Sequence, residues 1–216
     1  GNYQQQLPEH LRADLEPLRE FLIRHQREEQ ALLARQLAGA RYRRLKRSWR
    51  RYLESPLPQR PGARDARKPI LEVARRRTWR MYRRVRREGF AITPDSPATD
   101  LHELRKSCKK LRYLMEFFQA LFPAAELRKL TRELKSLQDN LGDFQDLEVQ
   151  TSTLGRYAEQ MRAEGHMNAR TERAMQTLQA GLKRGMHEVR SEFEQRFARF
   201  SRKPNAQRFQ RLFKHE

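Results

Sequence analysis

The sequence predicts an all-α protein built from antiparallel bundles of long helices. Apolar residues recur at alternating steps of three and four along nearly all of the 216 residues, which is the spacing of one helix face. No segment carries a credible strand pattern. The turns between the helical segments are short, as they are between antiparallel neighbours in a bundle.

The apolar spacing divides the chain into helical segments. Residues 7–22 include Pro17, where we expect a kink or the start of a second helix. Residues 26–54 are expected to form one helix. Prolines and a glycine then mark a linker at 56–66. Helical spacing resumes over 70–89, 98–122, 127–141, 147–161 and 175–200.

We therefore predict helices at 1–55, the linker at 56–66, a helical bundle at 67–203 and a C-terminal tail at 204–216. The apolar residues at steps of three and four are interpreted as plain bundle core, with no role in holding a cofactor.

Composition narrows the class of partner. The chain has 47 Lys and Arg against 27 Asp and Glu, a formal charge of +20, and Arg greatly outnumbers Lys. The guanidinium group binds phosphate oxygens through several donors at once. RNA, DNA, an anionic membrane surface and free polyphosphate are the candidate partners. One cysteine excludes an internal disulfide, and without a signal peptide or a long apolar run we expect a soluble cytoplasmic protein.

The segment LHELRKSCKKLRYLMEF (101–117) places cations along one side of a helix. The spacing i, i+3, i+7, i+10 confines this first stripe to a sector of about 80° that borders the apolar face, over a length of about 15 Å. Stacked cations repel one another, so carboxylates or an anionic ligand must compensate them. Lys106 and Lys110 project from other faces. The first stripe consists of His102, Arg105, Lys109 and Arg112, with Lys106 and Tyr113 as neighbouring candidates.

Two further segments are rich in arginine. Eight arginines fall within 74–88, where Glu88 is the one acidic residue, whereas a solvated helix surface usually mixes both signs. The segment 41–51 has seven cations and no acid; we interpret its aromatic residues, such as Trp49, as core, and stacking on nucleic-acid bases is the alternative. We expect the three stripes to form one continuous positive surface for a long polyanion. The second stripe consists of Arg76, Arg80, Arg83 and Arg87 with Arg84 beside it, and the third of Arg43, Arg44, Arg47, Arg50 and Arg51.

The segment LKSLQDNLGDFQDLEV carries an acidic row, Asp139, Asp143 and Asp146, at the spacing i, i+4, i+7. We expect Gly142 to end one helix and Asp143 to cap the next, which gathers the carboxylates at a helix junction. We predict that the acidic row anchors the first stripe structurally. A divalent ion is the alternative, but no standard metal-ligand spacing is present, and we assign no metal and no cofactor.

Two motifs together resemble the CHAD family, the conserved-histidine α-helical domain. They are His-x-x-Arg-x-x-x-Lys-x-x-Arg-Tyr at 102–113 and Leu-Gln-Asp-x-Leu-Gly-Asp-x-x-Asp at 137–146. The segments ARRRTWRMYRRV and ARYRRLKRSW also resemble sequences that flank these motifs, so the resemblance covers most of the chain. It implies two pseudo-symmetric helical bundles whose basic residues bind inorganic polyphosphate, without catalysis. The family usually carries both motifs twice; here they occur once, which implies that 1–55 is the end of an incomplete first repeat.

We predict a non-catalytic polyphosphate-binding protein, with recruitment to polyphosphate granules implied by the resemblance. The alternative is an RNA- or DNA-binding helical protein that uses the same basic surface, although no known nucleic-acid-binding motif is recognised. A phosphoesterase would need a metal-ligand cluster or an activated nucleophile, and the sequence indicates neither. Nothing in the sequence indicates an oligomeric state.

Overall fold

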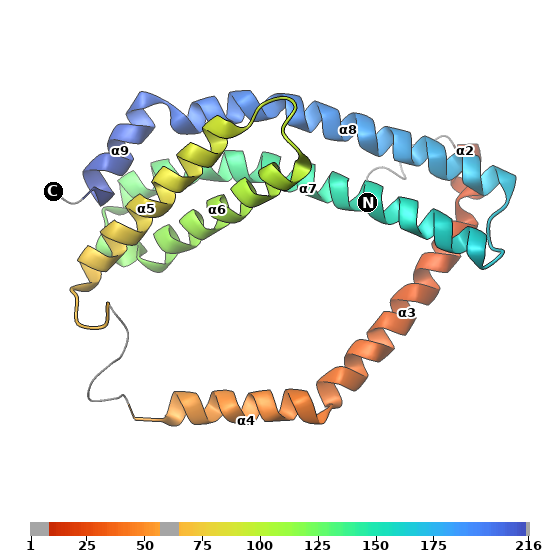
Figure 1. Cartoon of the computed structure of the whole chain (residues 1–216), viewed down its shortest axis with the longest axis horizontal. Coiled ribbons are helices and arrows are strands. Elements are labelled where there is room, and N and C mark those ends of the chain that lie inside the picture. The colour runs from red at the N-terminus through yellow and green to blue at the C-terminus, as the bar shows by residue number, and fades with distance from the viewer. Residues whose placement is uncertain (1–8, 57–64, 215–216) are drawn as a thin grey trace. The chain divides into compact units, whose positions relative to one another are not determined.

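The computed structural model describes residues 9–56 and 65–214, and within these ranges all regular structure is helical (Figure 1). This confirms the predicted all-α class. The elements are α2 (Glu9–Asp14), α3 (Glu16–Ala38), α4 (Ala40–Glu54), α5 (Ile70–Ala91), α6 (Ala98–Phe117), the 3₁₀ turn η1 (Gln119–Leu121), α7 (Ala124–Ala163), α8 (Ala169–Ser201) and α9 (Lys203–Phe213).

The chain divides into two compact units. The first takes residues 1–63 and 154–179, and the second takes residues 64–153 and 180–216. The predicted bundle at 67–203 is therefore not one unit. Helices α7 and α8 have 40 and 33 residues, whereas α6 has 20, so the longer helices have apolar residues left over that pack with the N-terminal helices.

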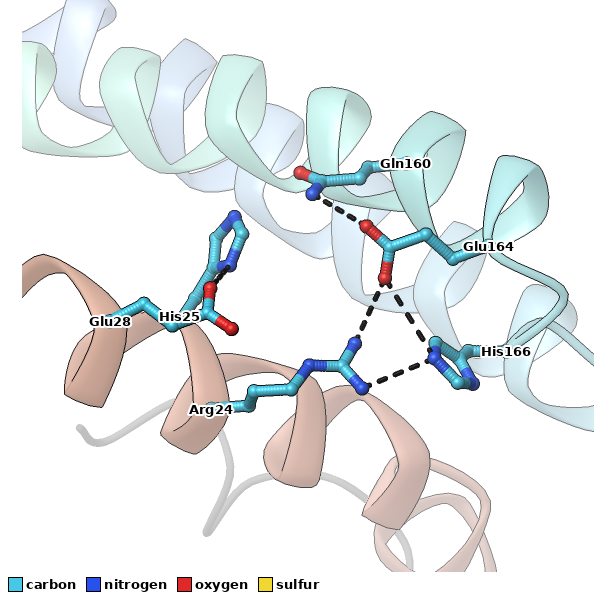
Figure 2. A network of polar contacts seen from close by, with 6 residues as sticks. All are labelled: Arg24, His25, Glu28, Gln160, Glu164 and His166. Atoms are coloured by element: carbon cyan, nitrogen blue, oxygen red, sulfur yellow. Dashed lines mark hydrogen bonds and ion pairs between the residues drawn. The ribbon is translucent and has the colours of Figure 1, made fainter.

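The first unit is held by an aromatic contact and a polar network between α3 and the end of α7. Phe21 is buried, and its ring meets Tyr157 edge-on at 5.5 Å between ring centroids. Arg24 donates from Nη2 to Glu164 Oε2 at 2.9 Å (Figure 2). Exposed ion pairs usually contribute about 0–1 kcal/mol, whereas burying a Phe side chain contributes about 1.5–3 kcal/mol. The burial of Phe21 therefore stabilises the first unit more than the exposed ion pair does.

A glycine turn after α7 brings a histidine into the same network. Gly165 adopts φ +71°, which favours glycine, and the His166 amide donates to the Met161 carbonyl at 2.8 Å across the turn. The His166 ring then lies beside Arg24, with 3.1 Å between Nε2 and Arg24 Nη1 (Figure 2). Because a guanidinium group can only donate, this ring nitrogen is the acceptor of the contact, and Arg24 is a partner that the sequence did not indicate.

The second unit has an aromatic core formed by α5, α8 and α9. The Tyr82 ring stacks on Phe209 at 3.9 Å between centroids, and Phe200 meets both rings edge-on. Helix α5 approaches α8 closely at Gly89, where a Cβ would lie 2.0 Å from the Phe197 ring. Helix α5 also packs beside α6 (Figure 1). Helices α6 and α7 add the fully buried side chains of Leu104, Leu111, Leu130, Leu134 and Leu137.

Two predicted helix boundaries near the N-terminus have different outcomes. Pro17 lies in the first turn of α3, so the expected new helix begins there. The single helix expected at 26–54 is wrong, because Gly39 is extended at φ −75° and ψ 165° between α3 and α4. Glycine costs about 1 kcal/mol in a helix interior relative to alanine, and here the helix ends at it.

The break expected at Gly142 is also wrong. Helix α7 continues through this residue, and Asp143 therefore does not cap a new helix. The cost of about 1 kcal/mol for one glycine is small beside the burial of Leu141 and Phe144 on the same helix. No side chain lies within 4 Å of a Cβ placed at Gly142, so the missing side chain leaves open space.

The C-terminal tail expected at 204–216 is wrong for the residues that the structure describes. Helix α9 fills this segment as far as Phe213, with Pro204 in its first turn. Phe209 and Phe213 are fully buried because their i, i+4 spacing turns both rings to the core of the second unit. Asn205 donates to the Phe200 carbonyl at 2.6 Å and closes the turn from α8.

The aromatic residues of the third stripe are not core, which corrects the interpretation favoured from the sequence. Helix α4 has no buried residue. Trp49 is 60% exposed and Tyr52 is 70% exposed, and their rings stack on each other at 5.7 Å between centroids. The apolar spacing of α4 was correct as a helix pattern, but the described residues bring no partner to cover that face.

The linker expected at 56–66 falls mostly on 57–64, outside the described residues. Over the ranges that the structure describes, none of the helices combines the length and the apolar character needed to cross a lipid bilayer.

Candidate functional site

The first stripe lies at the edge of the core of the second unit, as predicted. Arg105, Lys109 and Arg112 are each half-buried along α6, whereas Lys106 and Lys110 are exposed on other faces. The three half-buried cations line one surface hollow of about 410 Å³, together with Tyr113. The guanidinium of Arg112 also lies over the Tyr113 ring, 5.4 Å from its centroid.

The opposite wall of this hollow is the acidic row. Because α7 continues through Gly142, the spacing i, i+4, i+7 keeps Asp139, Asp143 and Asp146 on one side of the helix. Gly142 itself lines the hollow, where its missing side chain leaves room beside the carboxylates. The α6–α7 hollow, as we call it, thus places three cations opposite three carboxylates.

The two walls do not neutralise each other through direct contacts. Among the described residues, no hydrogen bond or ion pair joins the acidic row to the first stripe, so the predicted anchoring role is not observed. Arg112 pairs instead with Glu116 on its own helix, with 3.3 Å between Nε and Oε1. Lys106 pairs with Glu103 at 2.5 Å outside the hollow.

The pKa of Asp143 is raised on the acidic α7 wall of the hollow. Partial burial raises the pKa of its carboxyl, and the neighbouring charges of Asp139, Asp146 and Glu192 raise it further. Arg196 acts in the opposite direction but does not compensate them. The acidic row is therefore under repulsion that an added cation would relieve.

His102 is held by an amide and not by the acidic row. Its Nδ1 forms a hydrogen bond with Gln145 Oε1, and Gln145 Nε2 donates to Glu148 Oε2 at 3.1 Å. Because the Gln145 amide nitrogen is directed at the carboxylate, its oxygen accepts, and the proton of the imidazole lies on Nδ1. This arrangement fixes the orientation of the His102 ring.

The second stripe is partly neutralised within the protein. Arg76 and Arg77 both pair with Asp65, and Arg84 pairs with Glu88 at 2.6 Å. The hydrogen bonds from Arg76 and Arg77 lower the pKa of the Asp65 carboxyl to about 2. The remaining arginines of the stripe are exposed and form no ion pair with a described residue. They are Arg80, Arg83 and Arg87.

The third stripe lies on α4, in the first unit. All five of its arginines are exposed, and three of them line a shallow hollow of about 330 Å³ with Lys46. The first and second stripes belong to the second unit, so one continuous surface over all three stripes stays a prediction. The three arginines that line the hollow are Arg43, Arg47 and Arg50, and the other two are Arg44 and Arg51.

Sequence reasoning missed two amide residues. Gln145 orients His102, and Gln138 lines the α6–α7 hollow with only 8% of its surface exposed. Neither amide atom of Gln138 has a hydrogen-bond partner among the described residues. The signal was present in the sequence, since Gln138 is one step from Asp139 and four steps from Gly142 on the same helix.

Across the described residues, no group of three or more His, Cys, Asp or Glu side chains is arranged to hold a metal ion by itself. Cys108 is fully buried, and burial raises the pKa of its thiol far above the ordinary value. The site is therefore composed of cationic, acidic and amide side chains on rigid helices.

Long helices that carry one half-buried row of cations and further exposed ones define the chain as an all-α protein with strongly basic faces. The chain belongs to the CHAD domain family, whose family model matches residues 1–155. The match includes α4, α5, α6 and the wall of the α6–α7 hollow on α7. The family is associated with polyphosphate binding. A comparison with curated proteins finds no match.

Proposed function

We propose that the protein binds inorganic polyphosphate, without catalysis, through the first stripe in the α6–α7 hollow. One observation carries the proposal. Arg105 and Lys109 are half-buried at the rim of the core, line a hollow and form no ion pair with a described residue. Partial burial strengthens their attraction for an anion, because the local dielectric is lower than in water.

We propose that the second stripe adds to this binding surface. Arg80, Arg83 and Arg87 present three exposed guanidinium groups on α5, which packs beside α6 in the same unit. A ligand that engages both helices must be long and multivalent. Its affinity must also fall steeply with salt, because each neutralised phosphate releases counterions. Polyphosphate has these properties and carries no bases to be read.

Recruitment of the protein to polyphosphate granules follows from this activity. A granule presents many phosphate chains at high local concentration, so several moderate contacts on separate helices combine into firm binding.

RNA or DNA binding is the second candidate, and one observation favours it. On α4, Trp49 and Tyr52 are exposed and stacked within a segment that carries seven cations. Aromatic side chains among cations are typical of surfaces on which unpaired bases stack. No base-reading motif accompanies them, so polyphosphate remains the preferred ligand.

A competition measurement separates the two candidates. Labelled long-chain polyphosphate is bound to the protein and challenged with excess transfer RNA and, separately, with duplex DNA. We expect polyphosphate to remain bound. Ready displacement by either nucleic acid would exclude polyphosphate as the preferred ligand. Incubation of the bound chain with Mg²⁺ or Mn²⁺ should release neither orthophosphate nor shorter chains, and release of either would identify an enzyme.

A further inference from the structure

The formal charges that line the α6–α7 hollow cancel. Arg105, Lys109 and Arg112 contribute three positive charges, and Asp139, Asp143 and Asp146 contribute three negative charges. A bare polyphosphate chain on the cationic wall would have its remaining oxygens opposite three carboxylates. Like charges that line and fill the same hollow oppose binding. A ligand that fits both walls must present negative charge to α6 and positive charge to α7.

We propose that the α6–α7 hollow receives polyphosphate as its Mg²⁺ complex, with the cations of α6 on phosphate oxygens and the carboxylates of α7 on the metal ion. This inference rests on the proposed function and names the ionic form of its ligand. It also assigns the acidic row a role in binding, in place of the anchoring role that the structure does not show.

The chemistry of Mg²⁺ fits this division. Mg²⁺ is commonly held by one or two carboxylates together with phosphate oxygens and water, and not by an all-protein cage. The described residues contain no group able to hold a metal alone. The phosphate chain must therefore complete the coordination, and the ion and the chain bind together. By linkage, each then raises the affinity for the other.

Gln138 is an independent indication of a polar ligand in the hollow. Its side chain lines the hollow next to Asp139, and only 8% of its surface is exposed. Neither of its amide atoms has a hydrogen-bond partner among the described residues. An unpaired buried amide costs about 1–3 kcal/mol. Both amide atoms are enclosed, so a turn of the side chain towards the hollow would bring its N–H₂ group to a phosphate oxygen and its oxygen to a metal-bound water.

The test measures the affinity for long-chain polyphosphate in millimolar MgCl₂ and in EDTA, at equal ionic strength. For an ordinary basic surface, Mg²⁺ weakens binding, because it neutralises the phosphates that the protein would otherwise neutralise. We expect the opposite here, a gain of at least about fivefold, which is the low end of the usual range for coupled ligands. A fall in affinity with Mg²⁺ would overturn the proposal.

The variant Asp139→Asn/Asp143→Asn/Asp146→Asn isolates the role of the acidic row. All three side chains are exposed, so the fold should persist, which circular dichroism checks. We expect the variant to bind more tightly than the natural protein in EDTA, because repulsion is removed, and to lose the gain from Mg²⁺. An unchanged gain would contradict the proposal.

The matched control is Glu20→Gln/Glu29→Gln/Glu159→Gln. These carboxylates are exposed, form no ion pair with a described residue, lie in the first unit and give the same change in net charge. The control should keep the gain from Mg²⁺. If the natural protein binds no polyphosphate in either buffer, the proposed function fails. If it binds equally well in both, the function stands and the Mg²⁺ inference alone is wrong.

Discussion

Neutralising the first stripe is the perturbation that bears most directly on the proposed site. In the variant Arg105→Gln/Lys109→Gln, two half-buried cations of the α6–α7 hollow are lost. Hydrogen bonds to charged groups contribute about 1.5–3 kcal/mol each, and the low end suits side chains that are only half-buried. Two contacts at about 1.5 kcal/mol correspond to about 100-fold weaker polyphosphate binding.

The salt dependence gives a second, independent magnitude. Each phosphate contact contributes about 0.7–0.9 to the slope of the logarithm of the affinity against that of the salt concentration. The loss of two contacts should make this slope shallower by about 1.4–1.8. Fluorescence titrations with labelled long-chain polyphosphate at several salt concentrations, all in EDTA, measure both quantities.

The control for this experiment is Lys110→Gln/Arg128→Gln. It removes one Lys and one Arg from the same unit, and both side chains are exposed and lie outside the hollow. If overall charge alone drives binding, the two variants will weaken it equally, and the reasoning from the hollow is refuted. Equal affinities of the natural protein and the Arg105/Lys109 variant would move the site to the second or third stripe.

Three further predictions concern stability and reactivity. Gly89→Ala should lower the free energy of unfolding by about 1–3 kcal/mol, because its Cβ would lie 2.0 Å from the buried Phe197 ring. A thermal melt should show a midpoint lower by at least about 2 °C. An unchanged midpoint would mean that α5 and α8 pack less closely than in this structure. The Cys108 thiol should resist aromatic disulfide reagents until the protein unfolds, since it is fully buried with a raised pKa; rapid labelling of the native protein would contradict its burial. Asp65 has its pKa lowered to about 2 by Arg76 and Arg77, so its stabilising effect is complete above the ordinary pKa of 3.8 and is lost as the pH falls towards 2; Asp65→Asn should flatten the pH dependence of stability in that window, and an identical acid profile would show that these pairs do not form in solution.

The helical class and the first stripe could be predicted because both depend on local spacing. The steps of three and four place the cationic side chains on one side of α6 whatever the packing around them. The half-buried state of Arg105 and Lys109 follows from their angle to the apolar face. The same reasoning correctly left Lys110 on the solvent side.

The errors occurred where packing outweighs local preference. Gly142 is a reasonable helix end by propensity, but α7 buries residues on both sides of it and continues. Phe209 and Phe213 have the i, i+4 spacing of a short helix. The sequence alone does not show that the Tyr82 ring provides a surface against which this helix packs. The aromatic residues of α4 were expected in the core but are exposed. A helical apolar pattern does not show whether another element packs against that helix face.

The hydrogen bonds of Gln145 to His102 and Glu148, and the burial of Gln138 beside the acidic row, could not be predicted from spacing alone. Gln145 contacts α6 from α7 and Gln138 lines the hollow between these helices, and both positions depend on how the two helices are placed. Intramolecular neutralisation of the second stripe also depends on tertiary structure. Asp65 lies 11 residues before Arg76 and pairs with it through a turn.

A crystal structure of the protein with a long-chain polyphosphate, grown in MgCl₂, tests the central claim most directly. The account predicts phosphate density along Arg105, Lys109 and Arg112 in the α6–α7 hollow. Phosphate density confined to α4, with the α6–α7 hollow empty, would contradict it.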